Sequence, residues 1–295
     1  MGIEIVGLII VAFGGIALFR SAPMALTVLC VGGLLGAASA MAFGEANITP
    51  GHLSLAFFAL AVFIRPDFFK FSTMSLQPLR PGMFLLALCV WAVVSGYLLP
   101  RGFAGSLMAY PLNASNWMKV EERLWPTGSN LFQSIYFAAG LVIFIGVSTM
   151  VRTNSMMKRA GLAVLIAAGC NIAFAVIDLV TYSIGQTALL DFIRNADYAQ
   201  AYKQESMIGT KRVNGSFPEP SSFAAHSVAL FAFCFRLWRV GIRSNITGPL
   251  ALGTLIAVFL SFSSTGFGAL FVYLSFAYTA IALGTDRQGT PTIIA

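Results

Sequence analysis

The chain has 295 residues, of which 58% are hydrophobic and only 10% are charged, and its formal net charge at pH 7 is +7. Soluble domains carry about 25% charged residues, so this composition excludes an ordinary soluble protein. Apolar runs recur along the whole chain, and many approach the roughly 20 residues that cross a bilayer. The sequence therefore predicts an all-α, polytopic transmembrane helical bundle that forms a single integral membrane domain over residues 1–295.

The apolar runs predict about nine membrane spans in chain order. The third run is short, and its helix can extend through Phe68 and Phe69 with Arg65 snorkelling at its end. The expected spans cover approximately residues 3–19, 23–43, 51–64, 82–99, 131–150, 160–184, 220–238, 248–262 and 266–283.

The basic residues predict how these spans are oriented. Most of the Lys and Arg residues lie in one set of short loops, in which Asp67 is the single acidic residue. The positive-inside rule therefore places the N-terminus outside and the C-terminus in the cytoplasm. This asymmetry accounts for the net charge, so no nucleic-acid partner is expected. The basic residues of these loops are Arg20, Arg65, Lys70, Arg80, Arg152, Lys158, Arg159, Arg236, Arg239 and Arg243.

Two long loops, at about residues 100–130 and 185–219, are then external. Their aromatic residues can stack on sugar rings, or they can form the aromatic belt that is common at membrane boundaries. Within the second loop, residues 189–207 are expected to form a helix in the membrane interface, with Leu190, Ile193 and Tyr202 on its apolar side. External loops with defined chemistry are frequent locations of function.

Cysteine and histidine point to neither a disulfide framework nor a metal site. Cys30, Cys89, Cys170 and Cys234 each lie inside an expected span without a partner motif,. His52 and His226 are the only histidines in the chain. We therefore expect no metal ion and no cofactor.

Asp178 is an acidic residue inside the sixth expected span, about two turns from its outer end,. A carboxylate within a span is a candidate functional residue. Two alternatives stay open at this point, because Asp178 can pair with Asn171 or be hydrated from outside.

Charged and hydroxyl residues are concentrated between Lys211 and Ser222, where the second external loop enters the seventh span. One interpretation is a simple helix start, since Pro220 suits the first helical position and Glu219 suits the positive helix end. The other is a site for an anionic ligand. Glu219, Ser222 and His226 follow i, i+3 and i+7 spacing, so they share a helix face that is expected to lead from the loop into the bundle.

Two cations precede this helix, and they favour the ligand interpretation. Lys211 and Arg212 stand upstream of a turn at Gly215 and can fold back over the mouth of the bundle. A phosphate or pyrophosphate group suits that arrangement, because guanidinium offers bidentate geometry and lysine offers a point charge. The residues alone leave both interpretations open.

The same segment resembles the signature of the O-antigen polymerase/ligase (Wzy-type) superfamily. Two further segments resemble that superfamily, namely residues 129–136 after the first external loop and the serine-rich break at residues 261–266. Together the resemblance covers about residues 125–285. The residues that carry the main pattern are Arg212, Gly215, Phe217, Glu219, Pro220, Ser221 and Ala224.

The resemblance implies glycosyl transfer from a polyprenyl-pyrophosphate-linked oligosaccharide at the outer face of a bacterial inner membrane. Arg212 would stabilise the leaving pyrophosphate, and Glu219 or His226 would accept the proton of the attacking hydroxyl. The implied partners are this lipid-linked substrate, membrane lipid and other polysaccharide-assembly proteins. The residues expected to bind substrate are Lys211, Ser221, Ser222 and Asp178.

Two departures from the superfamily shape the functional prediction. Its members have more spans and a further large external loop, so we expect this chain to be a C-terminally truncated or fragmentary member. Thr265 stands where the ligase branch often has arginine, which favours a polymerase over an O-antigen ligase. The alternative class is a non-enzymatic protein, either a transporter or flippase for lipid-linked sugars or a partner in their assembly.

Overall fold

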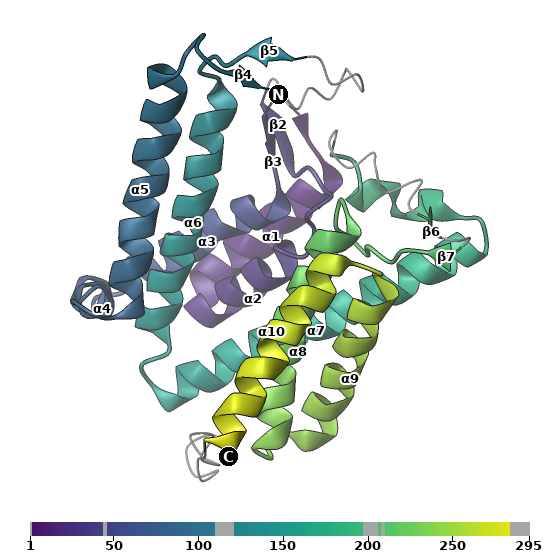
Figure 1. Cartoon of the computed structure of the whole chain (residues 1–295). Coiled ribbons are helices and arrows are strands. Elements are labelled where there is room, and N and C mark those ends of the chain that lie inside the picture. The colour runs from purple at the N-terminus through teal and green to yellow at the C-terminus, as the bar shows by residue number, and fades with distance from the viewer. Residues whose placement is uncertain (1, 44–45, 110–120, 197–205, 208–209, 284–295) are drawn as a thin grey trace. The chain divides into compact units, whose positions relative to one another are not determined.

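The computed structural model describes residues 2–43, 46–109, 121–196, 206–207 and 210–283, and most of these residues are helical (Figure 1). This confirms the predicted predominance of helices. The helices are α1 (Ile5–Arg20), α2 (Ala22–Gly32), α3 (Pro50–Phe63), α4 (Phe68–Ser75), α5 (Pro81–Gly102), α6 (Gly128–Met150), α7 (Asn154–Ser183), the 3-10 helix η1 (Thr187–Ile193), α8 (Pro220–Arg239), α9 (Ser244–Leu260) and α10 (Ser264–Ala282).

Short antiparallel strands occur before α1 and in the connections between helices, which the sequence analysis did not predict. The strands β1 (Gly2–Ile3), β2 (Met41–Phe43) and β3 (Ala46–Ile48) form one sheet. Two hairpin-like pairs lie in the long connections, β4 (Met108–Ala109) with β5 (Glu122–Arg123), and β6 (Ser206–Met207) with β7 (Thr210–Lys211).

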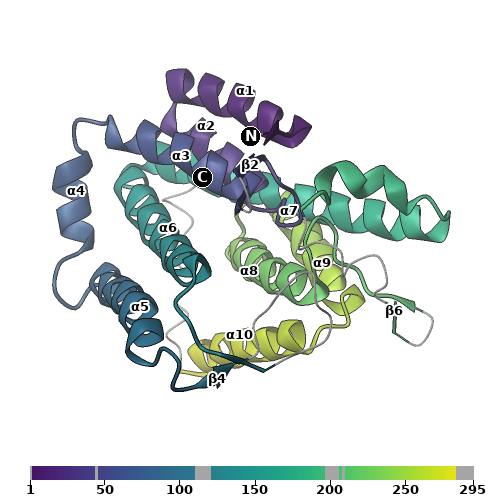
Figure 2. The ribbon, with the colours of Figure 1, turned by 90° about the horizontal axis from the view of Figure 1, so that it is seen from above.

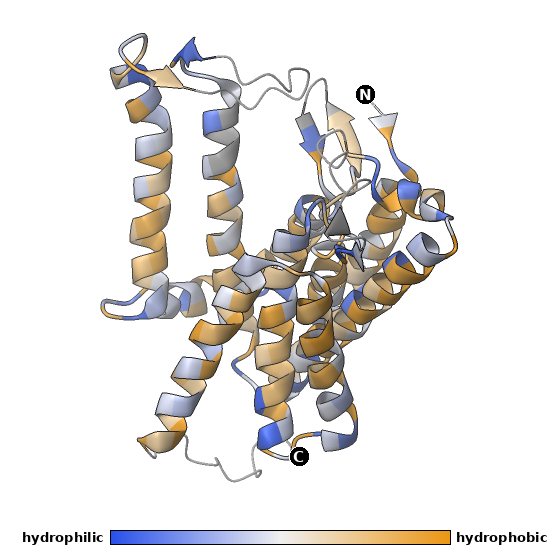
Figure 3. Ribbon diagram, turned by 45° about the vertical axis from the view of Figure 1, so that its right-hand side comes forward, coloured by the Kyte–Doolittle hydropathy of each residue, from blue (hydrophilic) through white to orange (hydrophobic). Residues whose placement is uncertain are grey.

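Several helices are suited to a membrane, and they make the chain a multi-pass membrane protein. Among the described residues, α5, α7, α8 and α10 are each long and apolar enough to cross a bilayer, and α3 with α4 adds a fifth candidate. Hydrophobic residues make up most of the length of the long helices, and hydrophilic residues are more frequent near helix ends (Figure 3). The helices α1, α2, α9 and the part Ser134–Met150 of α6 are apolar but shorter, so the count of nine spans stays a prediction.

Two of the expected spans are wrong as continuous helices. The span at residues 23–43 ends early because α2 stops at Gly32 and the chain turns toward β2. The backbone N–H of Ala37 there donates to the carbonyl oxygen of Ser216 instead of to a helical neighbour. The extension of the third span through Phe69 is also wrong, since α3 and α4 are bent by 110° at a break that contains Pro66, which cannot continue a helix without losing a hydrogen bond,.

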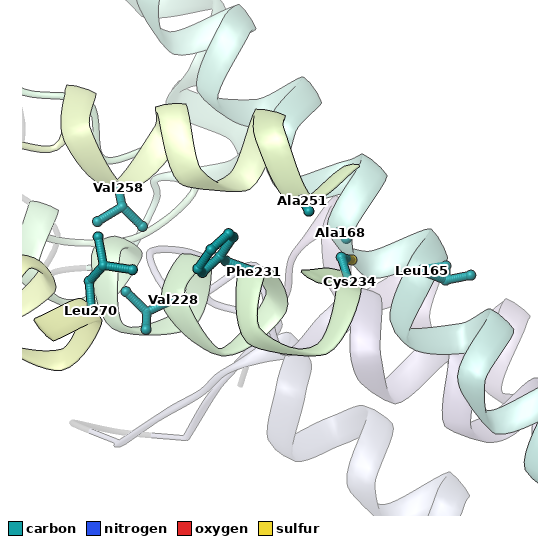
Figure 4. Packing of buried hydrophobic residues seen from close by; sticks show 8 residues of the cluster. All are labelled: Leu165, Ala168, Val228, Phe231, Cys234, Ala251, Val258 and Leu270. Carbon is teal, nitrogen blue, oxygen red and sulfur yellow. The ribbon is translucent and has the colours of Figure 1, made fainter. Parts of the chain in front are cut away.

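The chain divides into two compact units, one of Met1–Phe58 with Thr153–Ala295 (unit 1) and one of Ala59–Arg152 (unit 2). In unit 1, α7, α8 and α9 pack side by side and α10 lies along α8 (Figure 2). Gly266 permits this last contact, because a Cβ at that position would lie 2.6 Å from the Cβ of Ala224,. The core of these helices consists of Leu165, Ala168, Val228, Phe231, Cys234, Ala251, Val258 and Leu270 (Figure 4).

In unit 2, α5 packs against α6, and α4 packs against both of them. The hydroxyl of Ser134 on α6 donates to the carbonyl oxygen of Ala92 on α5 at 3.1 Å. A capping box of Thr127 and Asn130 begins α6, so the helix start is satisfied locally,. The first long loop is therefore framed by the ends of these two helices and by the β4–β5 pair, while residues 110–120 with Tyr110 and Trp117 lie outside the described residues.

Several loops of unit 1 meet at one end of its helices. The backbone N–H of Glu4 donates to the carbonyl oxygen of Ala40 at 3.1 Å, and that of Val213 donates to Leu260 at 3.0 Å. The start of α1, residues 33–43, the loop before α8 and the end of α9 are thereby brought together. The orientation prediction places these same segments on one side of the membrane, and its assignment of that side to the exterior stays a prediction.

Candidate functional site

Asp178, near the end of α7, is bound by the loop that leads into α8. Its side chain is 1% exposed. The backbone N–H groups of Asn214 and Gly215 donate to its Oδ2 at 3.0 and 3.2 Å. Gly215 has a φ of +55°, in the left-handed region that favours glycine, and a Cβ there would lie 3.2 Å from the Phe223 ring,. The turn at Gly215 therefore aims two consecutive amides at one buried carboxylate.

Arg194, which follows η1, joins the same carboxylate to the loop. Its Nη2 lies 2.6 Å from Asp178 Oδ1, and its Nε donates to the carbonyl oxygen of Gly215 at 3.0 Å. Its Nη2 also donates to this carbonyl oxygen. Both charged side chains are buried, so each supplies the partner that the other needs away from water,. One guanidinium thus connects the end of α7 with the loop before α8.

Lys211 completes this group from β7. Its Nζ lies 3.8 Å from Asp178 Oδ1, donates to Asn214 Oδ1 at 3.2 Å and is 5.7 Å from the centre of the Tyr182 ring. Its side chain faces the protein interior, with 5% exposure. We call Asp178, Arg194, Lys211, Asn214 and Gly215 the Asp178 cluster.

The alternative that Asp178 pairs with Asn171 is wrong, because Asn171 donates to the Ser227 hydroxyl at 2.9 Å. Both carboxylate oxygens of Asp178 instead accept from the loop and from Arg194. The sequence analysis did not identify Arg194 as the partner of Asp178. A signal was present, because a buried carboxylate needs a cation and Arg194 follows Asp178 by 16 residues,. The substrate-binding role of Asp178 stays a prediction.

Glu219, Ser222 and His226, which we call the surface row, do lie together as their spacing predicts. Helix α8 begins at Pro220 with Glu219 as its N-cap. The Ser222 hydroxyl donates to Glu219 Oε1 at 3.1 Å, and His226 Nδ1 is 3.0 Å from the Ser222 carbonyl oxygen. The expectation that this face leads into the bundle is wrong, because Glu219 and His226 are exposed. The opposite face of α8 carries the apolar residues that fill the core, including Phe223, Val228 and Phe231.

The contact with the Ser222 carbonyl oxygen indicates which nitrogen of the neutral His226 ring carries the proton. A carbonyl oxygen only accepts hydrogen bonds, so Nδ1 carries the proton and Nε2 keeps a lone pair,. The imidazole also packs on the Phe217 ring, with the two ring centres 4.6 Å apart. His226 is thus an oriented side chain whose Nε2 can accept a proton.

Arg212 connects the loop to the serine-rich break between α9 and α10. Its side chain is half-buried, and its Nε donates at 3.3 Å to the carbonyl oxygen of Ser261, the residue that caps α9. A cation is favourable at this negative helix end. Two of the three segments that carry the superfamily resemblance are therefore in contact. Ser221 is half-buried in the first turn of α8.

The expected interfacial helix at residues 189–207 is wrong in its described part. The 3-10 helix η1 ends at Ile193, and Ser206 and Met207 form strand β6. Leu190 and Ile193 are buried against Val6, Leu35 and Ala38 within unit 1, so their apolar side faces protein. Residues 197–205, with Tyr202, lie outside the described residues.

Comparison of the chain with protein-family models, with curated proteins and with solved structures gives no match. Within the described residues, no three His, Cys, Asp or Glu side chains are grouped as metal ligands would be. The functional interpretation therefore rests on the geometry of the Asp178 cluster, Arg212 and the surface row.

Proposed function

We propose that the chain is a surface-polysaccharide polymerase that transfers polyprenyl-pyrophosphate-linked glycan to an acceptor sugar at the outer face of a bacterial inner membrane. The observation that carries this proposal is the loop before α8, which the Asp178 cluster fixes in place. The same loop carries Arg212 and ends at Glu219, where the surface row begins. One ordered segment thus presents a cation, a carboxylate and an imidazole.

The proposed reaction is a displacement at the anomeric carbon of the donor sugar. The acceptor hydroxyl forms the new C–O bond, and the bond from that carbon to the lipid pyrophosphate breaks. The hydroxyl proton passes to Nε2 of His226, whose other nitrogen is held by the Ser222 carbonyl oxygen,. Arg212 stabilises the negative charge that grows on the pyrophosphate as it leaves. Glu219 is the alternative proton acceptor.

Lys211 and Arg212 have different parts in this proposal because they are neighbours with different surroundings. Lys211 is buried, and its ammonium lies beside the Asp178 carboxylate. Arg212 is half-buried and contacts the end of α9. We therefore assign the leaving-group role to Arg212, and Lys211 supports the loop that carries it.

The substitution Arg212→Ala tests this proposal in vesicles that contain the full chain and a lipid-linked oligosaccharide repeat. We expect the rate of glycan lengthening to fall by at least about 100-fold, the order of effect seen when one stabilising donor is removed from an active site. The matched control is Arg159→Ala, an exposed arginine in the first turns of α7, which should leave the rate unchanged.

Four other results would contradict the proposal or one of its parts. Normal chain lengths with Arg212→Ala at wild-type abundance would remove Arg212 from the reaction. Transfer of glycan only to a lipid A-type acceptor would indicate an O-antigen ligase. Movement of the lipid-linked repeat across the vesicle membrane without lengthening would indicate a flippase, and no turnover of either kind would indicate an assembly partner.

A further inference from the structure

A second polar feature lies in unit 2, where the short helix α4 meets the start of α5 and the end of α6 (Figure 1). Helix α4 is bent by 110° from α3. A short helix that bends away from an apolar neighbour in this way is typical of the membrane surface, where amphipathic helices lie. The orientation prediction places this end in the cytoplasm, because Arg65, Lys70 and Arg80 lie here,.

An open cavity of about 320 Å³ lies on the surface between these three helix ends. This volume is within the range of small-ligand sites. Every residue that lines the cavity belongs to unit 2, and none of them is acidic. We call this cavity the basic pocket, and its polar side chains are Ser75 from α4, Arg80 before α5, Ser148 from the end of α6 and Arg152 just after α6.

Arg152 is held in place at the pocket by contacts with three residues. Its Nη2 donates to the Ser75 hydroxyl at 3.3 Å, and its Nε donates to the carbonyl oxygen of Ser148 at 3.1 Å. The guanidinium lies 5.3 Å from the centre of the Phe71 ring. These contacts orient a planar cation at the pocket wall without neutralising its charge.

Arg80 supplies a second cation, and its charge is not compensated locally. Its side chain is exposed and makes no hydrogen bond or ion pair with any residue that the structure describes. It is the N-cap of α5, so the positive end of a long helix adds to the same field,. Two guanidinium groups, the Ser148 hydroxyl and a helix start therefore surround one cavity without an anion among its walls.

The surroundings of the pocket are apolar. Leu79, next to Arg80, is 84% exposed. Phe144 and Val151 form the apolar part of the pocket wall. A polar, cationic pocket with apolar neighbours at a helix end matches the boundary between lipid headgroups and acyl chains.

We propose that the basic pocket binds the phosphate of an anionic phospholipid from the cytoplasmic leaflet. Arg80 and Arg152 bind the phosphate oxygens, which guanidinium groups match in geometry. The Ser148 hydroxyl donates a further hydrogen bond, and an acyl chain lies along Phe144 toward the apolar surface of α5 and α6. This inference is independent of the proposed polymerase, because none of its residues belongs to that site.

The test compares lipid binding by the full chain in nanodiscs of phosphatidylcholine with and without phosphatidylglycerol. Native mass spectrometry counts the retained phosphatidylglycerol, and thermal unfolding measures the shift in Tm. We expect phosphatidylglycerol to be retained and to raise the Tm. Arg80→Ala should weaken the binding about fivefold, the contribution of one basic residue near an anionic surface, and Arg80→Glu should weaken it further.

Arg101→Ala is the matched control, because this arginine lies at the opposite end of α5 with its guanidinium 3.8 Å from the Tyr97 ring centre. It should bind phosphatidylglycerol as the wild type does. Equal affinity in Arg80→Ala, Arg80→Glu and the wild type would overturn the proposal. So would an equal loss in Arg101→Ala, or full occupation of the pocket by inorganic phosphate in nanodiscs of phosphatidylcholine alone.

Discussion

The Asp178 cluster and the basic pocket each contain two cations, but the surroundings of these cations differ. In the Asp178 cluster, Arg194 and Lys211 are buried and share one carboxylate, which also accepts two backbone N–H groups. In the basic pocket, Arg80 and Arg152 are exposed, and no acidic side chain lines the cavity.

The difference separates cations that organise the chain from cations that can bind a ligand. A buried carboxylate neutralises charge and fixes the backbone that donates to it, so Arg194 and Lys211 hold the loop before α8. Without a carboxylate nearby, Arg80 keeps its charge for an anion from outside. Arg212 is intermediate, since it is half-buried and its Nε donates to the carbonyl oxygen at the end of α9.

The largest expected effect is the loss of stability in Arg194→Ala. Removal of the guanidinium leaves the Asp178 carboxylate buried, with the Lys211 ammonium 3.8 Å from its Oδ1. We expect the free energy of unfolding to fall by about 3–5 kcal/mol, as when one partner of a buried ion pair is removed. Denaturant titration in detergent micelles measures this change.

Arg80→Ala is the matched substitution in the basic pocket. Because Arg80 is exposed, its loss should change the free energy of unfolding by less than about 0.5 kcal/mol. Equal destabilisation by the two substitutions would remove the distinction between organising and ligand-binding cations.

A smaller effect is expected for Gly215→Ala, which strains the turn that aims two amides at Asp178. The φ of +55° disfavours a Cβ, and the added methyl group would lie 3.2 Å from Phe223. We expect a loss of about 1–2 kcal/mol from the backbone conformation, with a further loss from the contact. Thermal unfolding of the purified chain measures the sum of the two losses in stability.

Gly185→Ala separates these two contributions. Gly185 has a φ of +71°, but a Cβ there meets no atom within 4 Å. Its substitution should therefore cost only the backbone part. If Gly215→Ala were the less damaging of the two, the turn at Gly215 would not be a packed part of the Asp178 cluster.

The sequence predicted those features that local patterns determine. Long apolar runs were sufficient for α5, α7, α8 and α10, because each is long enough to cross a bilayer,. The start of α8 at Pro220 and the grouping of Glu219, Ser222 and His226 followed from helix chemistry and helix periodicity,.

Features that depend on pairing between distant segments were not predictable in the same way. Residues 33–43 are apolar enough to continue the expected span, but the backbone N–H of Ala37 donates to Ser216 and that of Ser39 donates to Asn195. Apolar composition carries no information about such partners. Arg194 was missed for the same reason, since its role depends on a carboxylate in another element. The bend between α3 and α4 had a local signal in Pro66, which the apolar count outweighed.

Hydrogen exchange at the amides of Asn214 and Gly215 tests most directly whether Asp178 fixes the loop that carries the proposed site. In the wild type both amides donate to a buried carboxylate, so they should exchange slowly. In Asp178→Asn, we expect exchange at least about tenfold faster, as a hydrogen bond to a charged group is replaced by one to a neutral group. Exchange in α10 should remain unchanged. Equal rates at Asn214 and Gly215 in the two proteins would contradict the account.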